Sequence, residues 1–205
     1  MGQQAQKNMQ IGPTNRIRGE MMGQQNTVHE ETNQPPQCSA RDNIILVGMP
    51  ASGKSTVGVI LAKVLAYDFI DTDILIQRAQ KKSLAAIIGE KGIDEFLRIE
   101  NQVCSSVECT HSVIATGGSA IYGREAMEHF GKIGIVIYLK VEYDALVKRL
   151  HNIQSRGVVL REGQSFRDLY EERTKLYEKY AGMVVEEHGD VEDVIVEIVQ
   201  RLSNY

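Results

Sequence analysis

From residue 43 onward, short apolar runs alternate with longer stretches in which apolar residues recur every three or four positions. The short runs predict buried strands, and the longer stretches predict amphipathic helices. We expect strands at residues 44–47, 69–71, 112–115, 133–139 and 183–185. We expect helices at residues 54–66, 74–79, 83–88, 93–108, 124–130, 141–150, 166–181 and 190–202. This alternation indicates an α/β fold of three layers, in which helices cover both faces of a parallel sheet.

Residues 1–42 follow neither period and differ in composition from the rest of the chain. They hold eight Gln, four Asn, four Gly and three Pro, and no Phe, Trp or Tyr. Because such a segment has little apolar surface to bury, we interpret it as a disordered tail without chemistry of its own. A later start at Met9, Met21 or Met22 is the alternative interpretation. The folded unit is then a single domain of residues 43–205.

Composition excludes several classes of protein. Lys and Arg total 23 against 27 Asp and Glu, so the formal net charge of −4 leaves no basic excess for a nucleic-acid backbone. The three cysteines lack the spacing of a disulfide framework or a zinc site. No run of 18 apolar residues and no apolar signal segment is visible. We expect a cytoplasmic monomer that binds neither nucleic acid nor membrane.

Residues 48–55 read Gly-Met-Pro-Ala-Ser-Gly-Lys-Ser and match the phosphate-loop pattern GxxxxGK[ST] between a predicted strand and a predicted helix. In such a loop, backbone N–H groups surround a phosphate and the helix directs the positive end of its dipole at the same anion. We expect Lys54 to bridge the β- and γ-phosphates of a nucleoside triphosphate, Ser55 to bind Mg²⁺ and Thr56 to reach another phosphate oxygen. The predicted nucleotide-binding residues of this segment are Gly48, Ala51, Ser52, Gly53, Lys54, Ser55 and Thr56.

Two carboxylates, Asp71 and Asp73, stand at the end of the second predicted strand. One of them could cap the helix that begins near Ile74, because Asp favours N-cap positions, but capping does not account for both. We expect Asp71 to hold Mg²⁺ through water. Asp73 projects to the same side two residues later, so we expect it to accept a hydrogen bond from a substrate hydroxyl and orient that hydroxyl for in-line attack.

A glycine pair follows the third predicted strand, in the segment Ala115-Thr116-Gly117-Gly118-Ser119. Glycine permits close approach to the backbone, so Gly117 and Gly118 are candidates for contact with a substrate or with the γ-phosphate. A plain turn is the alternative interpretation. The NKxD pattern of GTPases is absent from the sequence, which disfavours that class.

These motifs together resemble the shikimate kinase family, whose fold is that of the nucleoside-monophosphate kinases. The resemblance spans residues 43–205 and implies a phosphate-loop domain with a lid, ATP and Mg²⁺ as cofactors, and a small hydroxylated acid as acceptor. It implies that Asp73, Gly117 and Gly118 contact the substrate. It also implies that Asp71 lies on the metal side.

The same resemblance implies roles for two arginines. Arg156, in the segment Ser-Arg-Gly-Val-Val-Leu, resembles the lid arginine that closes over ATP. Arg173 resembles the arginine that binds the substrate carboxylate, in a pattern written RxxLYxxxA. The expected catalytic residues are thus Lys54, Asp71, Asp73 and Arg156.

Three positions depart from the family pattern. Phe96 is followed by Leu97 where an arginine that binds the substrate carboxylate is usual, while Glu100 occupies the later position of that pattern. Ser119 replaces the third glycine of a GGG loop, where it would crowd the pocket or donate a new hydrogen bond. Gly157 follows the lid arginine where proline is usual. These departures point toward a relative with a different polar alcohol as acceptor.

The sequence is compatible with several functions. The leading hypothesis is ATP-dependent phosphorylation of a hydroxyl on a small metabolite, with shikimate, which would become shikimate 3-phosphate, as the first candidate. A kinase of another polar alcohol is the alternative. A regulator that binds nucleotide without catalysis is disfavoured, because the residues for metal and acceptor are all present. A nucleotide kinase is also disfavoured, because a pair of carboxylates would repel a phosphate acceptor.

Overall fold

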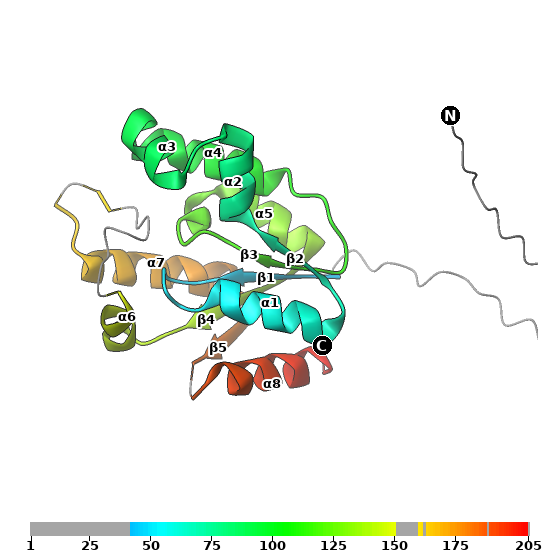
Figure 1. Ribbon diagram of the computed structural model, residues 1–205. Coiled ribbons are helices and arrows are strands. Elements are labelled where there is room, and N and C mark those ends of the chain that lie inside the picture. The colour runs from blue at the N-terminus through cyan, green and yellow to red at the C-terminus, as the bar shows by residue number, and fades with distance from the viewer. Residues whose placement is uncertain (1–41, 151–159, 162, 188, 205) are drawn as a thin grey trace, which may run out of the picture. The chain divides into compact units, whose positions relative to one another are not determined.

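The structure, a computed structural model, describes residues 42–150, 160, 161, 163–187 and 189–204. In these residues five strands form one parallel sheet of order β2-β3-β1-β4-β5 (Figure 1). The strands are β1 (Asn43–Val47), β2 (Asp68–Asp71), β3 (Ser112–Ala115), β4 (Gly134–Lys140) and β5 (Met183–Glu186). The α-helices are α1 (Lys54–Leu65), α2 (Thr72–Gln80), α3 (Leu84–Lys91), α4 (Ile93–Ser105), α5 (Arg124–Ile133), α6 (Tyr143–Arg149), α7 (Phe166–Tyr180) and α8 (Val191–Leu202). The predicted α/β fold with a parallel sheet is confirmed, whereas the predicted lid at Arg156 lies outside the described residues.

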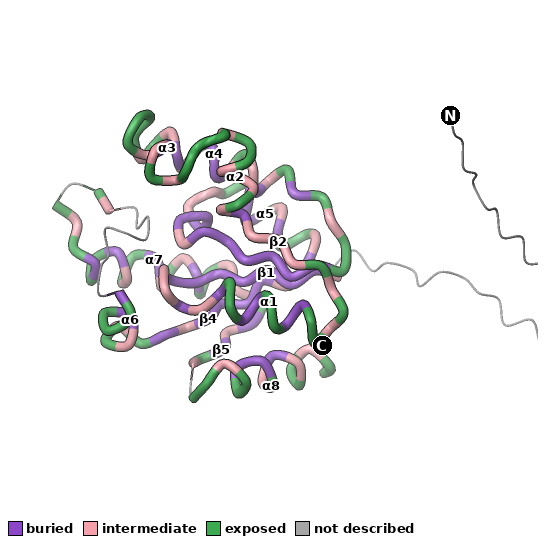
Figure 2. The backbone as a smooth tube through the Cα atoms, in the orientation of Figure 1, coloured by how far each residue is buried: buried purple, intermediate pink, exposed green. Residues whose placement is uncertain are grey.

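Side chains alternate along the central strand β1, so the sheet has two apolar faces. Ile44 and Leu46 face one layer, where they pack in a cluster with residues of α1 and α8. Ile45 and Val47 face the other layer, in a cluster that includes residues of α4, α5 and α7. Figure 2 shows the three central strands β1, β3 and β4 as largely buried, whereas the edge strands β2 and β5 are more exposed. Helices on both faces therefore make the three layers that the sequence predicts.

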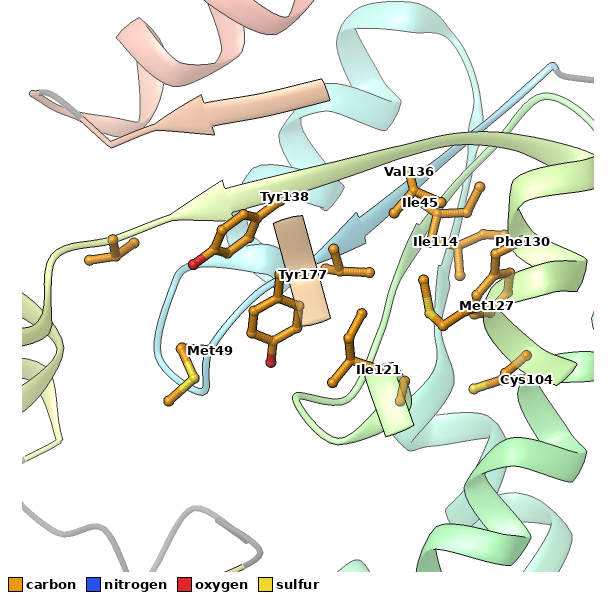
Figure 3. Packing of buried hydrophobic residues seen from close by; sticks show 14 of the residues in the cluster. Ile45, Met49, Cys104, Ile114, Ile121, Met127, Phe130, Val136, Tyr138 and Tyr177 are labelled. Atoms are coloured by element: carbon orange, nitrogen blue, oxygen red, sulfur yellow. The ribbon is translucent and has the colours of Figure 1, made fainter. Parts of the chain in front are cut away.

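The α5 and α7 side of the sheet holds the larger aromatic side chains. Figure 3 shows Tyr177 of α7 beside Tyr138 of β4, and Met127 and Phe130 of α5 beneath Ile114 and Val136. The rings of Tyr138 and Tyr177 are stacked, with centroids 4.9 Å apart. Offset stacking of this kind adds stabilisation beyond the burial of area.

Helices α2, α3 and α4 form a smaller cluster of their own. Its buried apolar residues are Ile76, Ile87, Phe96 and Ile99. Helix α4 joins this cluster to the sheet, because Cys104 at its other end packs in the α5 and α7 cluster. The small cluster therefore stands beside the carboxyl ends of β2 and β3 (Figure 1).

Element boundaries differ from the predictions by a few residues, for local reasons. Helix α2 begins at Thr72 and not at Ile74, because the Asp71 carboxylate caps it by accepting a hydrogen bond from the Asp73 N–H at 3.0 Å. Helix α4 ends at Ser105, and a short 3-10 helix at Ala120–Tyr122 was not predicted. Among the described residues, no helix is both long enough and apolar enough to cross a membrane.

Candidate active site

A cleft of about 280 Å³ opens at the carboxyl ends of β1, β2 and β3. Parallel strands of an α/β sheet end at one edge, which is where such folds bind their ligands. The loops after these strands bring three of the predicted motifs into one place. The residues that line the cleft are Pro50, Ala51, Gly53, Lys54, Ser55, Thr56, Asp73, Leu84, Phe96, Glu100, Thr116, Gly117, Gly118 and Ser119.

The loop between β1 and α1 has the backbone of an anion-binding loop. Gly48 has a φ of +152°, and a Cβ atom there would lie 2.8 Å from the carbonyl oxygen of Leu139, so a side chain does not fit. Ala51 and Gly53 have φ values of 65° and 83°, in the left-handed region. Turns of this kind direct successive N–H groups to one side. Within the described chain no side chain caps the start of α1, so its first N–H groups suit a phosphate.

Lys54 lies folded against this loop. Its Nζ donates to the carbonyl oxygens of Gly48 and Met49, both at 2.9 Å, and to Ser52 Oγ at 3.4 Å. The residue is only 8% exposed, and burial lowers its pKa from 10.5 to about 8, against the opposing charge of Asp73. At neutral pH the lysine therefore keeps its positive charge in a largely dehydrated position, where a charge acts strongly on a phosphate.

Ser55 and Asp71 bring two hard oxygen donors together at the nucleotide side of the cleft. Ser55 Oγ donates to Asp71 Oδ2 at 3.1 Å, while the other oxygen of Asp71 caps α2. A hydroxyl and one carboxylate suit Mg²⁺, which in kinases takes most of its other ligands from water and phosphate oxygens. No cluster of three or more His, Cys, Asp or Glu able to hold a metal occurs in the described residues, so an all-protein metal cage is not indicated there.

Asp73 faces the same cleft from the first turn of α2. Burial raises the pKa of its carboxyl, and the negative charge of Asp71 raises it further, whereas the positive charge of Lys54 lowers it. The charges of Asp73 and Lys54 therefore lie close enough to shift each other's pKa.

The segment after β3 is held at each of its four residues. Thr116 Oγ1 donates to the Leu46 carbonyl at 3.0 Å. The Gly117 N–H donates to Thr72 Oγ1 at 3.1 Å, and the Gly118 carbonyl accepts from Tyr177 OH at 2.6 Å. Ser119 Oγ donates to Glu100 Oε2 at 2.6 Å. This glycine loop, residues 116–119, is therefore held by hydrogen bonds to other elements of the described chain.

Glu100 is a carboxyl group buried at the floor of the cleft, only 1% exposed. Burial raises its pKa to about 7, against the hydrogen bond from Ser119. Its side chain approaches Gly117 so closely that a Cβ atom there would lie 2.3 Å from Glu100 Oε1. A side chain at position 117 would therefore have to displace the Glu100 carboxyl.

Arg173 of α7 reaches the other side of the glycine loop. It is 1% exposed, and a Cβ atom on Gly118 would lie 3.2 Å from its Nη1. Its Nε donates to Tyr122 OH at 3.3 Å, and its guanidinium carbon lies 5.1 Å from the centroid of the Tyr122 ring. A buried guanidinium in this position suits a carboxylate, which it can bind through two parallel hydrogen bonds.

Comparison with known proteins adds independent information on this chain. The sequence model of the family described as shikimate kinase matches residues 50–203. The chain belongs to the shikimate kinase family. Relatives include the shikimate kinase of Rippkaea orientalis, 39% identical over 78% of this chain and 87% of that protein. The shikimate kinase of Clostridium botulinum strain Loch Maree is 36% identical over 80% of this chain and 98% of that protein.

Solved structures of shikimate kinases have the same fold as this chain. The shikimate kinase from Acinetobacter baumannii in complex with shikimate has a TM-score of 0.72 and 33% sequence identity, and the match covers 80% of this chain and 94% of that one. The shikimate kinase from Aquifex aeolicus has a TM-score of 0.68 and 30% identity, and the match covers 78% and 96% of the two chains. The chain is therefore a small-molecule phosphotransferase of a family that uses ATP.

Most residues predicted from the sequence meet in the cleft of this shikimate kinase family member. Lys54, Ser55, Asp73, Gly117 and Gly118 line it directly. Asp71 accepts a hydrogen bond from Ser55, which lines the cleft, and Arg173 lies beside Gly118. Arg156 falls in residues 151–159, which lie outside the described residues, so its predicted role over ATP stays a prediction.

Leu97 does not line this cleft. It lies with Arg98 and Tyr122 in a second cleft of about 440 Å³. Arg98 is occupied there by a two-bond contact with Glu95 at 2.7 and 2.8 Å. As the rotation along the helix indicates, Arg98 does not take the place of the arginine that Leu97 replaces.

Sequence reasoning gave no role to Thr72, Glu100, Tyr122 or Tyr177. One signal for Glu100 was available, since it lies four residues from both Phe96 and Cys104 on the apolar stripe of its helix. A charged residue on such a stripe is either paired or functional. Tyr177 is the tyrosine of the pattern RxxLYxxxA, but the pattern does not say what its hydroxyl contacts. Thr72 and Tyr122 have no comparable signal, because their contacts depend on the tertiary fold.

Proposed function

We propose that this chain transfers the γ-phosphoryl group of ATP to a hydroxyl of shikimate, with shikimate 3-phosphate as the product. Membership of the shikimate kinase family supports the acceptor. The observation that carries the proposal is that Lys54 and Asp73, the residues for phosphate and for acceptor hydroxyl, line one cleft beside a fixed glycine loop. Phosphoryl transfer requires mainly such positioning and electrostatic stabilisation.

In this proposal the loop of residues 48–56 binds the nucleotide. The N–H groups of the loop and of the start of α1 bind the phosphates, and Lys54 leaves its loop carbonyls to neutralise the charge that develops on the transferred group. Ser55 and, through water, Asp71 would hold Mg²⁺, which supplies positive charge to the phosphate oxygens when it is bound. Arg156 completes this side as the predicted lid residue.

The acceptor side falls to Asp73, the glycine loop and Arg173. Asp73 accepts a hydrogen bond from the reacting hydroxyl and orients its oxygen toward the γ-phosphate. The Gly117 and Gly118 backbone forms the surface under the substrate ring. Arg173 binds the substrate carboxylate, and it does so without an arginine at position 97.

The test is ADP release measured with a coupled assay across a panel of hydroxylated acids that includes shikimate. We expect turnover of shikimate above all other acids, and phosphorus NMR of the product should place the phosphate on the 3-hydroxyl. Asp73→Asn should reduce use of the acceptor far more than the affinity for ATP. Turnover of another acid without turnover of shikimate would refute the acceptor and favour a kinase of a different alcohol.

We keep the monomer and the cytoplasmic location as predictions. Light scattering on the purified protein at the assay concentration tests the first, and a dimer there would contradict it.

A further inference from the structure

The guanidinium of Arg173 lies against the glycine loop, although the residue belongs to α7. Arg173 is 1% exposed, so its charge is largely removed from water. Its Nη1 is near the loop, because a Cβ atom on Gly118 would lie 3.2 Å from that nitrogen. A planar guanidinium binds a carboxylate through two parallel hydrogen bonds only when its fork faces the carboxylate. The groups that orient Arg173 therefore affect how well it can bind an acidic ligand.

Tyr122 contacts this guanidinium in two ways. Its hydroxyl oxygen accepts a hydrogen bond from Arg173 Nε at 3.3 Å. Its ring lies against the same group, with the guanidinium carbon 5.1 Å from the ring centroid, which is within the range of a cation–π interaction. Burial raises the pKa of the Tyr122 hydroxyl from 10.0, so the hydroxyl is neutral at neutral pH. Both contacts therefore restrain the guanidinium without adding a negative charge that would compete with a ligand.

Tyr122 is placed by the segment that also forms the glycine loop. It ends the short 3-10 helix Ala120–Tyr122, which begins directly after Ser119. The Tyr122 N–H donates to the Ser119 carbonyl at 3.0 Å, and the first two residues of the 3-10 helix are buried in the α5 and α7 cluster. One continuous segment therefore carries both the backbone that lines the cleft and the side chain that contacts the guanidinium.

The contact of Tyr122 with Nε determines which edge of Arg173 suits a carboxylate. A guanidinium can bind a carboxylate end-on, through Nη1 and Nη2, or side-on, through Nε and Nη2. The side-on edge needs the single N–H of Nε, which donates to Tyr122. The end-on edge includes Nη1, which is near Gly118, a residue that lines the active-site cleft. The contacts therefore favour end-on binding of a carboxylate in the cleft.

We propose that Tyr122 is a positioning residue of the acceptor site, which holds Arg173 so that its two terminal nitrogens bind the substrate carboxylate. The inference rests on the proposed function and deepens it, because it assigns the affinity for acidic acceptors partly to a residue outside the sequence motifs. Tyr122 acts through Arg173 and not on the substrate itself. Its loss should therefore weaken only ligands that carry a carboxylate.

The test compares Tyr122→Phe, which keeps the ring, with Tyr122→Leu, which loses both the ring and the hydroxyl. Initial rates of ADP release give KM and kcat for shikimate, and the amide of shikimate, which has no carboxylate, is measured as a competitive inhibitor. Tyr122→Phe should raise the KM for shikimate about five-fold, and Tyr122→Leu about ten- to fifty-fold. Because the carboxylate is remote from the reacting hydroxyl, kcat, the KM for ATP and the Ki of the amide should change by less than about two-fold.

A double variant shows whether Tyr122 acts through Arg173. Arg173→Lys keeps a positive charge but cannot form two parallel hydrogen bonds. Adding Tyr122→Phe to Arg173→Lys should raise the KM for shikimate by less than about two-fold, whereas independent effects would multiply.

Tyr170→Phe is the matched control for the loss of a tyrosine hydroxyl. Tyr170 lies on α7, and its hydroxyl donates to the Val141 carbonyl, also at 3.3 Å. Tyr170→Phe should leave the KM for shikimate and the Ki of the amide unchanged. If Tyr122→Leu does not fold, the comparison of Tyr122→Phe with Tyr170→Phe decides.

Three results bear against the inference or its basis. An unchanged KM for shikimate in Tyr122→Phe and Tyr122→Leu would overturn it. Equal changes for shikimate and the amide, or a lower kcat at unchanged KM, would mean that Tyr122 supports only the fold of the glycine loop, while the proposed function stands. No turnover of shikimate by the wild type would refute the proposed function, and this inference with it.

Discussion

Replacing Lys54 with methionine separates the catalytic role of this residue from its effect on stability. Burial lowers the lysine pKa from 10.5 to about 8, which corresponds to a cost of about 3 kcal/mol to the folded state at pH 7. Its two hydrogen bonds at 2.9 Å offset this cost by about 1 to 1.5 kcal/mol each. Lys54→Met removes both contributions, so the free energy of unfolding should change by no more than about 1 kcal/mol at pH 7.

The same variant should diverge from the wild type at high pH. Below pH 8 the lysine is protonated in both the folded and the unfolded state. Between pH 8 and 10.5 the unfolded state binds more protons, so the stability of the wild type rises with pH relative to the methionine variant. Between pH 7 and pH 10 the wild type should therefore gain about 2.5 kcal/mol of stability relative to the methionine variant.

Denaturant unfolding at pH 7 and pH 10, with ADP release as the activity assay, tests both statements. Lys54→Met should abolish turnover, while its melting temperature at pH 7 should stay within about 4 °C of the wild type. Lys63→Met, which removes an exposed lysine from the same helix, is the control and should retain turnover. A stability difference between wild type and Lys54→Met that does not change with pH would refute the argument from burial, and retained turnover would refute the assigned site.

Four further changes test separate parts of the molecule. Asp71→Asn keeps a side chain that can cap α2 but should raise the Mg²⁺ concentration for half-maximal activity about ten-fold, and an unchanged Mg²⁺ titration would contradict its metal role. Tyr177→Phe removes the donor to the Gly118 carbonyl and should raise the KM for the acceptor several-fold at a stability cost of about 1 kcal/mol in denaturant unfolding. Leu97→Arg should lower the KM for shikimate about ten-fold if the new cation reaches the carboxylate, and a lower kcat/KM would show an unpaired charge instead. Deleting residues 1–40 should leave kcat and KM unchanged, so a large loss would refute the interpretation of that segment as an inert tail.

Local patterns predicted the strands and the phosphate loop well, because their signals lie within a few consecutive residues. Asp71 shows where such reasoning works: it is the last residue of β2, caps the next helix and accepts a hydrogen bond from Ser55, sixteen residues earlier. The hydrogen bond between Ser119 and Glu100, which lie nineteen residues apart, could not be predicted. The sequence did not decide whether the Ser119 side chain would crowd the pocket or donate a hydrogen bond. The Tyr177 bond to Gly118 spans 59 residues and depends on how α7 packs on the sheet, which no short pattern encodes. The position of Leu97 could not be predicted either, because only the packing of α4 places this residue in the second cleft.

Tyr177 belongs to two parts of the protein at once. Its ring stacks on Tyr138 inside the core (Figure 3), and its hydroxyl donates to the carbonyl of Gly118, which lines the active-site cleft. Efforts to make this enzyme more heat-resistant by repacking its interior would treat the position as an ordinary aromatic site, for which phenylalanine is the natural exchange. A library selected in this way would contain stable variants with reduced turnover. Variants of α7 should therefore be screened for turnover as well as for thermal stability, because a screen for folded protein alone would not detect the loss of activity.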